Sequence, residues 1–204
     1  DMTEAARPVR RELKVVYHES ERAAKIVHNL LVFTGSHRMA RERMPIDRVV
    51  TRALTSRAAH LRKAEVKVDR RKGANLPDVF VDPLLLQQAV LNVLINAEHA
   101  MAGAATRRLD IETHARQKGT VGLTIRDSGP GIAADVLPRI FDPFFTTKEV
   151  GQGSGLGLAI SYGIIHEHGG TIAASCPPEG GAMFQIELPA ADDKVAPGPI
   201  KDDR

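Results

Sequence analysis

Two asparagines lie four residues apart in the most strongly helical stretch of the sequence. Asn92 and Asn96 fall on one face of a helix, with Gln88 one turn before them and His99 three residues after. Neutral amide oxygens suit Mg²⁺, which prefers oxygen ligands and keeps waters and substrate phosphates as its other ligands. The spacing therefore predicts a metal site at Asn96 and Asn92. Taken alone, the same pair is also typical of a solvent-facing helix surface.

A carboxylate followed by glycines ends a predicted strand. Asp127 precedes Ser128, and Gly129, Gly131 and Ile132 follow within five residues. A buried carboxylate accepts hydrogen bonds and donates none, so it suits the exocyclic amine of adenine and rejects a guanine carbonyl. Glycines let the backbone approach a flat base closely. The segment predicts an adenine-binding turn, although by itself it is also typical of an ordinary turn.

Glycines at every second position open a further predicted helix. Free amide N–H groups and the positive end of a helix dipole both favour an anion at such a place. Leu158 replaces the third glycine of a dinucleotide fingerprint and no Walker loop is present, so neither class of enzyme explains the pattern. The candidate triphosphate contacts are Phe144, Thr146, Thr147, Lys148, Gly151, Gly153, Ser154, Gly155, Leu156 and Gly157.

Alternating helices and strands must position these residues, which indicates an α/β fold. Residues 141–157 are too long for a turn and too poor in packing residues for a core element, so we expect a functional loop there. Residues 190–204 are typical of a disordered tail or linker. Periodicity predicts helices over residues 9–38, 46–61 and 83–101, and strands over 66–69, 79–81, 109–113, 121–125, 170–175 and 182–188.

The amino-terminal helix has a hydrophobic seam with alternating spacings of four and three. Such a seam is typical of a helical bundle or coiled coil, so we expect this helix to pair with others in a dimer. The sequence offers no second helix of this kind, and residues 39–45 are predicted to be the linker that leaves the bundle. The seam residues are Leu13, Tyr17, Ala24, Val27 and Leu31.

Composition narrows the class of protein. A net charge of +3 with interleaved signs gives no support for nucleic-acid binding. No apolar run approaches the ~20 residues of a membrane helix, so we expect no membrane contact from this segment. The single cysteine, Cys176, cannot form an internal disulfide, and we interpret it as a strand residue. These features favour a cytoplasmic location, and a parent protein anchored in the membrane remains compatible with them.

The four blocks around Asn96, Asp127, Phe144 and Gly155 resemble, in order and spacing, the N box, first glycine box, F box and second glycine box of the sensor histidine kinases. These kinases share a superfamily with DNA gyrase, MutL and related chaperones. The resemblance covers roughly residues 45–189 and is closest to the nitrogen-regulator subclass. It implies a Bergerat-type α/β sandwich that binds ATP or ADP with Mg²⁺ beneath a flexible lid.

The resemblance also assigns the ends of the chain. Residues 1–38 are similar to the second helix of a dimerisation and phosphotransfer hairpin, which implies a homodimer of the parent protein and a response regulator as partner. His18 and Glu19 give only the first two letters of a phosphoacceptor box. We therefore expect the acceptor histidine to be absent, the chain to be a piece of a longer protein, and this piece not to phosphorylate itself. The catalytic domain is predicted over residues 46–189.

Two alternatives stay open at this point. A hydrolytic ATPase or chaperone of the same superfamily would use the same pocket, but those enzymes resemble one another in carrying a glutamate where Asn92 stands, and an amide cannot act as a general base. A non-catalytic regulator would keep the nucleotide site, or only the partner helices, without transferring a phosphoryl group.

Overall fold

A computed structural model describes residues 12–13, 16–17, 39–116, 119–148 and 154–191. The chain divides into two compact units, residues 1–38 and 39–204. In the first unit the described residues are helical, and Leu13, Val16 and Tyr17 are each 62% exposed. The rest of the predicted amino-terminal helix, with His18, lies outside the described residues, as does the predicted tail from residue 192.

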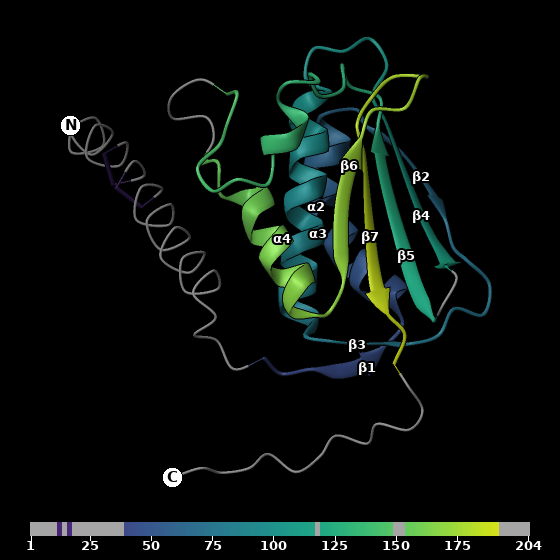
Figure 1. The fold of residues 1–204 in the computed structure, drawn as a ribbon. Helices are drawn as coiled ribbons and strands as arrows, with labels where there is room; N and C mark the ends of the chain where they lie inside the picture. Colours follow the sequence, from purple (N-terminus) through teal and green to yellow (C-terminus); the bar gives the residue numbers. More distant parts are fainter. Residues whose placement is uncertain (1–11, 14–15, 18–38, 117–118, 149–153, 192–204) are drawn as a thin grey trace, which may run out of the picture. The chain divides into compact units, whose positions relative to one another are not determined.

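The second unit is built on a mixed five-stranded sheet (Figure 1). Only β2 and β4 pair in parallel, and the other neighbours are antiparallel. In β4 and β7 buried and less buried residues alternate, because one face of the sheet packs on helices. The strand order is β2 (Lys67–Arg71), β4 (Arg108–Arg116), β5 (Thr120–Asp127), β7 (Met183–Pro189) and β6 (Thr171–Ser175).

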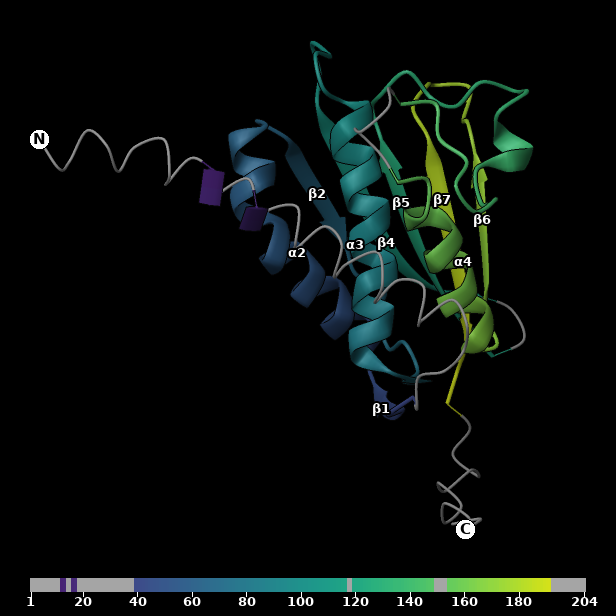
Figure 2. The ribbon, with the colours of Figure 1, turned by 90° about the vertical axis from the view of Figure 1, so that its left-hand side faces the viewer.

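Three helices cover a single face of this sheet: α2 (Ile46–Lys63), α3 (Pro83–Ala100) and α4 (Gly157–Glu167) (Figures 1 and 2). Helix α3 lies between the other two and contacts both. Its start is fixed by Asp82, whose Oδ1 accepts hydrogen bonds from the N–H groups of Leu84 and Leu85, with Pro83 at the first helical position. The predicted two-layer α/β sandwich is confirmed, and the predicted helices and strands of this unit are found within a few residues.

A small second sheet was not predicted. Strand β1 (Glu42–Met44) pairs antiparallel with β3 (Val79–Val81), within the segment that the sequence assigns to a linker. Two of its three residues, Glu42 and Arg43, are charged and exposed, so β1 lacks the apolar run that predicted the equally short β3. The residues that follow β7 reach the same small sheet: Ala190 forms a β-bridge with Val79, and the Ala191 N–H donates to the Asp78 carbonyl.

Two further features complete the unit. A short 3₁₀ helix, η1 (Leu137–Arg139), lies between the Asp127 turn and the glycine-rich stretch, and was also not predicted. None of the helices within the described residues is long and apolar enough to cross a membrane.

Candidate functional site

Helix α3 carries the predicted metal pair on the side that faces α4. The Asn92 side-chain amide donates from Nδ2 to the Gly157 carbonyl at 2.9 Å and to the Ser161 hydroxyl at 3.3 Å. This orientation leaves Oδ1 of Asn92 as its available group. One turn further on, Asn96 is half-buried, and within the described part of the chain its amide has no hydrogen-bond partner. The start of α4 therefore fixes the side chain of Asn92, whereas the amide of Asn96 remains available to a ligand.

The side-chain oxygens of Asn92 and Asn96 fit a magnesium ion that is bound together with an anionic ligand. Amide oxygens are hard, neutral ligands of the kind that Mg²⁺ accepts. Among the described residues no group of three or more His, Cys, Asp or Glu side chains gathers to hold a metal alone. A metal at Asn92 and Asn96 would thus need its remaining ligands from water and from the phosphates of a bound nucleotide.

Asp127 ends β5 as a buried carboxylate, 3% exposed. Its Oδ1 accepts hydrogen bonds from the N–H groups of Gly129 at 2.8 Å and Ala182 at 3.3 Å. Within the described residues Oδ2 has no hydrogen-bond donor. Burial raises the pKa of this carboxyl group, and the two N–H groups oppose that effect. The turn therefore holds one carboxylate oxygen and leaves the other for a donor from outside.

Three glycines allow the surrounding backbone to lie close to the Asp127 turn, because they have no Cβ. A Cβ on Gly129 would lie 2.8 Å from Asp127 Oδ1 and 3.1 Å from Cβ of Ala100 at the end of α3. Gly131 has a φ of +82°, which a side chain rarely adopts. A Cβ on Gly181 would overlap the Asp127 carbonyl. The sequence singled out Gly129 and Gly131 for close approach but not Gly181, because Gly181 reaches the turn only through the pairing of β5 with β7.

Cys176 also belongs to this turn, contrary to its interpretation as a strand residue. It follows β6, and its sulfur accepts from the Ile132 N–H at 3.1 Å and donates to the Ile132 carbonyl at 3.3 Å. Nothing near Cys176 in the sequence indicates a contact 44 residues away. The thiol fixes the backbone of the predicted adenine-binding turn.

The predicted phosphate donors meet α3 at its carboxyl-terminal end. Nζ of Lys148 lies 2.8 Å from Nδ1 of His99. Burial lowers the pKa of both groups, and the Lys148 charge lowers the pKa of His99 further. A neutral imidazole that accepts from the ammonium satisfies this geometry. A cationic lysine and a neutral histidine from separate motifs therefore lie together, and both can donate hydrogen bonds to an anionic ligand.

Phe144 and Gly155 lie against each other at the two described sides of the glycine-rich stretch. Phe144 has a φ of +66° and is 68% exposed. A Cβ on Gly155 would overlap the Phe144 carbonyl, so only glycine allows this approach. Thr146 Oγ1 accepts from the Lys148 N–H at 3.2 Å, and the exposed Thr147 lies between them.

The helix end of this loop is only partly described. Ser154 Oγ accepts from the N–H of Leu156, which is buried at the start of α4. Gly151 and Gly153 lie outside the described residues. The predicted phosphate loop is therefore described on both sides of its centre.

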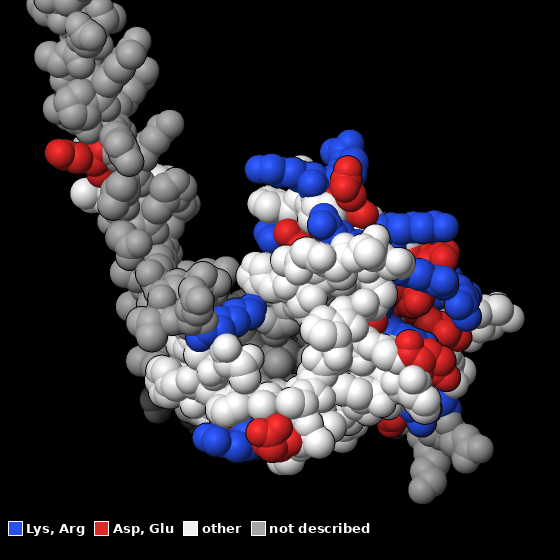
Figure 3. Space-filling model, turned by 90° about the horizontal axis from the view of Figure 1, so that it is seen from above, with Lys and Arg blue, Asp and Glu red and all other residues white. Residues whose placement is uncertain are grey.

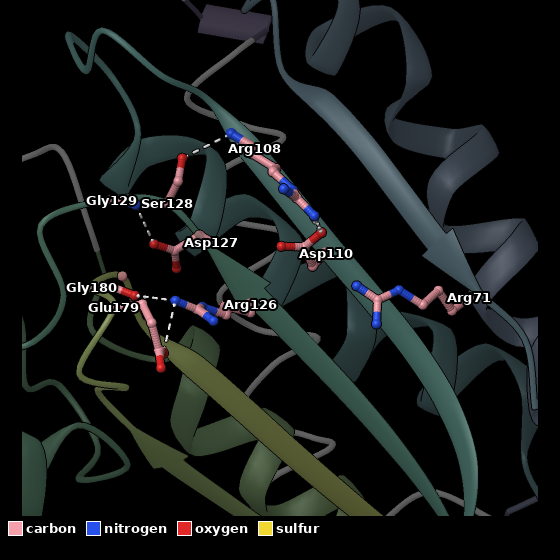
Figure 4. A pocket seen from close by; sticks show the side chains of 10 residues that line it. Arg71, Arg108, Asp110, Arg126, Asp127, Ser128, Gly129, Glu179 and Gly180 are labelled. Atoms are coloured by element: carbon pink, nitrogen blue, oxygen red, sulfur yellow. Dashed lines mark hydrogen bonds and ion pairs between the residues drawn. The ribbon is translucent and has the colours of Figure 1, made fainter.

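A hollow of about 330 Å³ lies beside the Asp127 turn, and its other walls come from strands β2, β4 and β5 and from residues 179–181 between β6 and β7 (Figure 4). Its arginines are paired, since Arg108 lies 2.8 Å from Asp110 and Arg126 lies 3.4 Å from Glu179. Neither asparagine of α3 lines it. Lys, Arg, Asp and Glu side chains also intermingle on the face drawn in Figure 3. The hollow therefore shares the Asp127 turn with the candidate site but does not include the asparagines of α3.

One helix thus brings the predicted blocks together. Along α3, Asn92 contacts α4, His99 contacts the F-box lysine, and Ala100 touches the Asp127 turn. The sequence placed these blocks up to 65 residues apart. Their common contact with α3 is the geometry that a single ligand spanning a metal, a base and phosphates requires.

Comparison with known proteins agrees with this geometry. Residues 81–192 match the family model described as histidine kinase-, DNA gyrase B-, and HSP90-like ATPase. The sensor histidine kinase ZraS of Salmonella typhimurium is 34% identical over 178 residues, which is 86% of this chain and 37% of ZraS. The sensor kinase CckA of Brucella abortus is 35% identical over 85% of this chain and 20% of CckA. The chain therefore spans well under half the length of these relatives.

Solved structures show the same fold. The catalytic domain of histidine kinase ThkA is 28% identical, with a TM-score of 0.65 over 74% of this chain and 97% of that one. Full-length ShkA in complex with AMPPNP is 24% identical, with a TM-score of 0.76 over 89% of this chain and 39% of ShkA. Because the family model covers more than half of the 204 residues, the chain belongs to the histidine kinase-, DNA gyrase B- and HSP90-like ATPases, as an ATP-binding catalytic domain of the sensor histidine kinase type.

Proposed function

We propose that this chain is the part of a sensor histidine kinase that binds ATP with Mg²⁺ and delivers the γ-phosphoryl group to a histidine of a dimerisation hairpin. The convergence of Asn96, His99 and the Asp127 turn on helix α3 carries the proposal. The similarity to ZraS and to the ThkA catalytic domain supports it. The resemblance to the nitrogen-regulator subclass stays a prediction.

Each group of residues has a distinct task in this proposal. The open carboxylate oxygen of Asp127 accepts from the adenine amine, while Asn96 and Oδ1 of Asn92 hold the metal. Lys148 and His99 contact the phosphates, together with the amides of the second glycine box. When bound, Mg²⁺ supplies charge neutralisation between the phosphates. What the protein adds is positioning, which dominates catalysis of phosphoryl transfer.

Transfer to histidine is favoured over hydrolysis by the environment of Asn92. Its amide cannot accept a proton from water, and its N–H groups already bind Gly157 and Ser161. In the transfer step a neutral imidazole nitrogen would bond to the γ-phosphorus as the bond to the bridging oxygen breaks and ADP leaves. The predicted position of that histidine is the first helix of the dimerisation hairpin.

The partners follow from the same proposal. The structure of ThkA in complex with the response regulator TrrA is 25% identical with a TM-score of 0.66, which supports a receiver domain as the phosphoryl acceptor of the next step. The exposed apolar side chains of Leu13, Val16 and Tyr17 support a homodimer formed through the first unit.

Calorimetry of the 204-residue chain with ATP tests the nucleotide site directly. We expect binding that requires Mg²⁺ and a much weaker response to GTP, because Asp127 would face the guanine carbonyl. Asn96→Ala should weaken binding in Mg²⁺ by about tenfold or more while the melting temperature stays unchanged, since its amide has no partner among the described residues. Absence of binding heat and of any thermal shift would remove the proposal.

Labelled ATP separates transfer from hydrolysis. The chain alone should stay unlabelled, whereas a version extended by the first hairpin helix should gain an acid-labile, base-stable phosphate. Labelling of the 204-residue chain itself would contradict the predicted absence of the acceptor. Rapid phosphate release without labelling of the extended version would favour the hydrolytic alternative.

A further inference from the structure

His168 is a buried titratable group that the proposed chemistry does not use. It lies at the end of α4 and is 5% exposed. Its Nδ1 lies 2.6 Å from the Ile164 carbonyl, and its Nε2 lies 2.9 Å from the Asp82 backbone nitrogen. Because a carbonyl only accepts and a backbone N–H only donates, Nδ1 carries the proton and Nε2 is the acceptor. The bonded ring is therefore neutral.

Asp82 extends this contact to the start of the unit. One carboxylate oxygen, Oδ1, caps α3 through the N–H groups of Leu84 and Leu85. The other, Oδ2, accepts from the Ala40 N–H at 2.9 Å. A single residue therefore ties helix α3 and, through its own N–H, His168 of α4 to the segment of residues 39–44, which we call the junction segment.

Arg41 adds a second contact between the junction segment and α4. Its guanidinium donates to the Glu167 carbonyl at 2.6 Å, at the helix end where a positive charge is favourable. Next to it, β1 pairs with β3, with Glu42 opposite Val81. Figures 1 and 2 both show β1 at the end of the unit where α3 begins and α4 ends. The junction segment is thus held by both helices that carry the candidate site.

A proton on Nε2 would break this arrangement. The imidazolium has two N–H groups, so Nε2 would face the Asp82 N–H as a second donor in a buried place. The charged groups that act on the ring are Arg41 from the junction segment, Asp82 at the start of α3 and Glu167 on α4. Burial lowers the pKa of His168 below 6.5, and Arg41 lowers it further, while the bond to Ile164 and both carboxylates oppose this.

We propose that Asp82, His168 and Arg41 form a proton-sensitive latch that fixes the junction segment to helices α3 and α4 and releases it when His168 takes up a proton. The folded state favours the neutral ring. The latch is therefore fully closed above pH 6.5 and opens as the pH falls through the lower pKa of the folded state. These residues act by positioning the segment that joins the first unit, and any effect on phosphoryl transfer rests on the proposed kinase function.

Hydrogen exchange of single amides measures the latch without reference to nucleotide. We expect the Ala40 and Asp82 amides of the 204-residue chain to lose at least about tenfold of their protection as the pH falls from about 7.5 through the pKa of His168, which ring resonances of the same chain locate, after correction for intrinsic exchange. His168→Gln keeps an amide oxygen that can accept from Asp82 and cannot titrate, so its protection should stay flat. His60→Gln, at an exposed position of α2, is the matched control and should behave like the parent.

Two results would overturn the latch. One is protection of Ala40 and Asp82 that stays constant while ring resonances show His168 becoming protonated. The other is equal loss of protection in His168→Gln and in the parent. Affinity for ATP with Mg²⁺, measured at about pH 7.5 on the same samples, separates the two proposals. A chain that shows the pH-dependent exchange but binds no ATP would retain the latch and lose the kinase.

Discussion

Asp82 and Asp127 are the two buried carboxylates among the described residues, and they lie at opposite ends of α3. Both oxygens of Asp82 accept hydrogen bonds from the protein, from Leu84 and Leu85 on one side and Ala40 on the other. Only Oδ1 of Asp127 does so within the described part of the chain. Burial alone therefore does not distinguish a structural carboxylate from a binding one, whereas an oxygen left open does.

The histidines at the two ends differ in the same way. His168, beside Asp82, has both ring nitrogens bonded to backbone groups. His99, at the other end of α3, meets a lysine from a loop and is exposed to solvent. At the start of α3 the polar side-chain atoms of Asp82 and His168 all bond to the protein. At its other end, polar atoms of Asp127 and His99 remain accessible to a ligand.

Asp127→Asn tests this comparison with the largest expected effect. The amide keeps the oxygen that accepts from Gly129 and Ala182 but presents a donor to the adenine amine, so ATP affinity should fall about 10- to 100-fold, or ~1.5–3 kcal/mol. Calorimetry with ATP and Mg²⁺ measures this. Asp82→Asn is the matched control, since asparagine also caps a helix, and should leave affinity unchanged. Equal losses of ATP affinity in both variants would contradict the assignment of Asp127 as the binding carboxylate and Asp82 as the structural one.

The same variant carries a pH signature. Burial raises the pKa of Asp127 above 3.8 in the folded state. The contribution of this group to the free energy of unfolding therefore falls as the pH rises from about 3.8 through the pKa of the folded state. Asp127→Asn should lack this part of the pH dependence and should be no less stable than the parent at neutral pH. Urea unfolding at several pH values checks both points.

A glycine of the second glycine box and a glycine inside α4 test the same difference between binding and structural positions. Gly155→Ala places a side chain on a left-handed backbone, at about 1–2 kcal/mol, and against the Phe144 carbonyl, so ATP affinity should fall about tenfold. Gly163→Ala, inside α4 with open space around its Cβ, should raise the free energy of unfolding by about 0.5–1 kcal/mol and spare affinity. Calorimetry and urea unfolding on each variant separate these effects, and an unaffected affinity in Gly155→Ala would show that the Phe144 contact is not part of the binding state.

Asp82→Ala tests the start of α3 itself. Loss of the helix cap should lower the free energy of unfolding by about 1 kcal/mol, and Asp82→Asn should recover most of that loss. Thermal and urea unfolding provide the measurement. A fully stable Asp82→Ala variant would mean that the bonds to Leu84 and Leu85 contribute little.

The smallest expected effect concerns the pKa of His99. Burial and the Lys148 charge both lower that pKa, so the ring should titrate below 6.5 in the parent and closer to that value in Lys148→Gln. NMR titration of the ring measures both. His60, exposed at the end of α2, serves as the internal control, and an unchanged pKa of His99 in the variant would show that the two side chains do not interact in solution.

The sequence predicted most of the fold because its helices and strands are long enough to show a period. Helical periodicity predicted α3 over residues 83–101, and alternation predicted β4 and β5. Strand β1 was not predicted because two of its three residues are charged, whereas the equally short β3 is apolar throughout. The contacts of Cys176 with Ile132 and of Gly181 with Asp127 were not predicted because they depend on which strands pair.

Residue chemistry was readable from the sequence alone: amides at helical spacing, a carboxylate before glycines, and glycines before a helix are local patterns with local physical causes. The sequence did not decide which polar atoms stay open. Asp82 and Asp127 are both an aspartate next to a strand end, and only the packing of distant backbone against them completes one and leaves the other free. Availability for a ligand is what remains after all other contacts have formed, so it is a property of the tertiary structure.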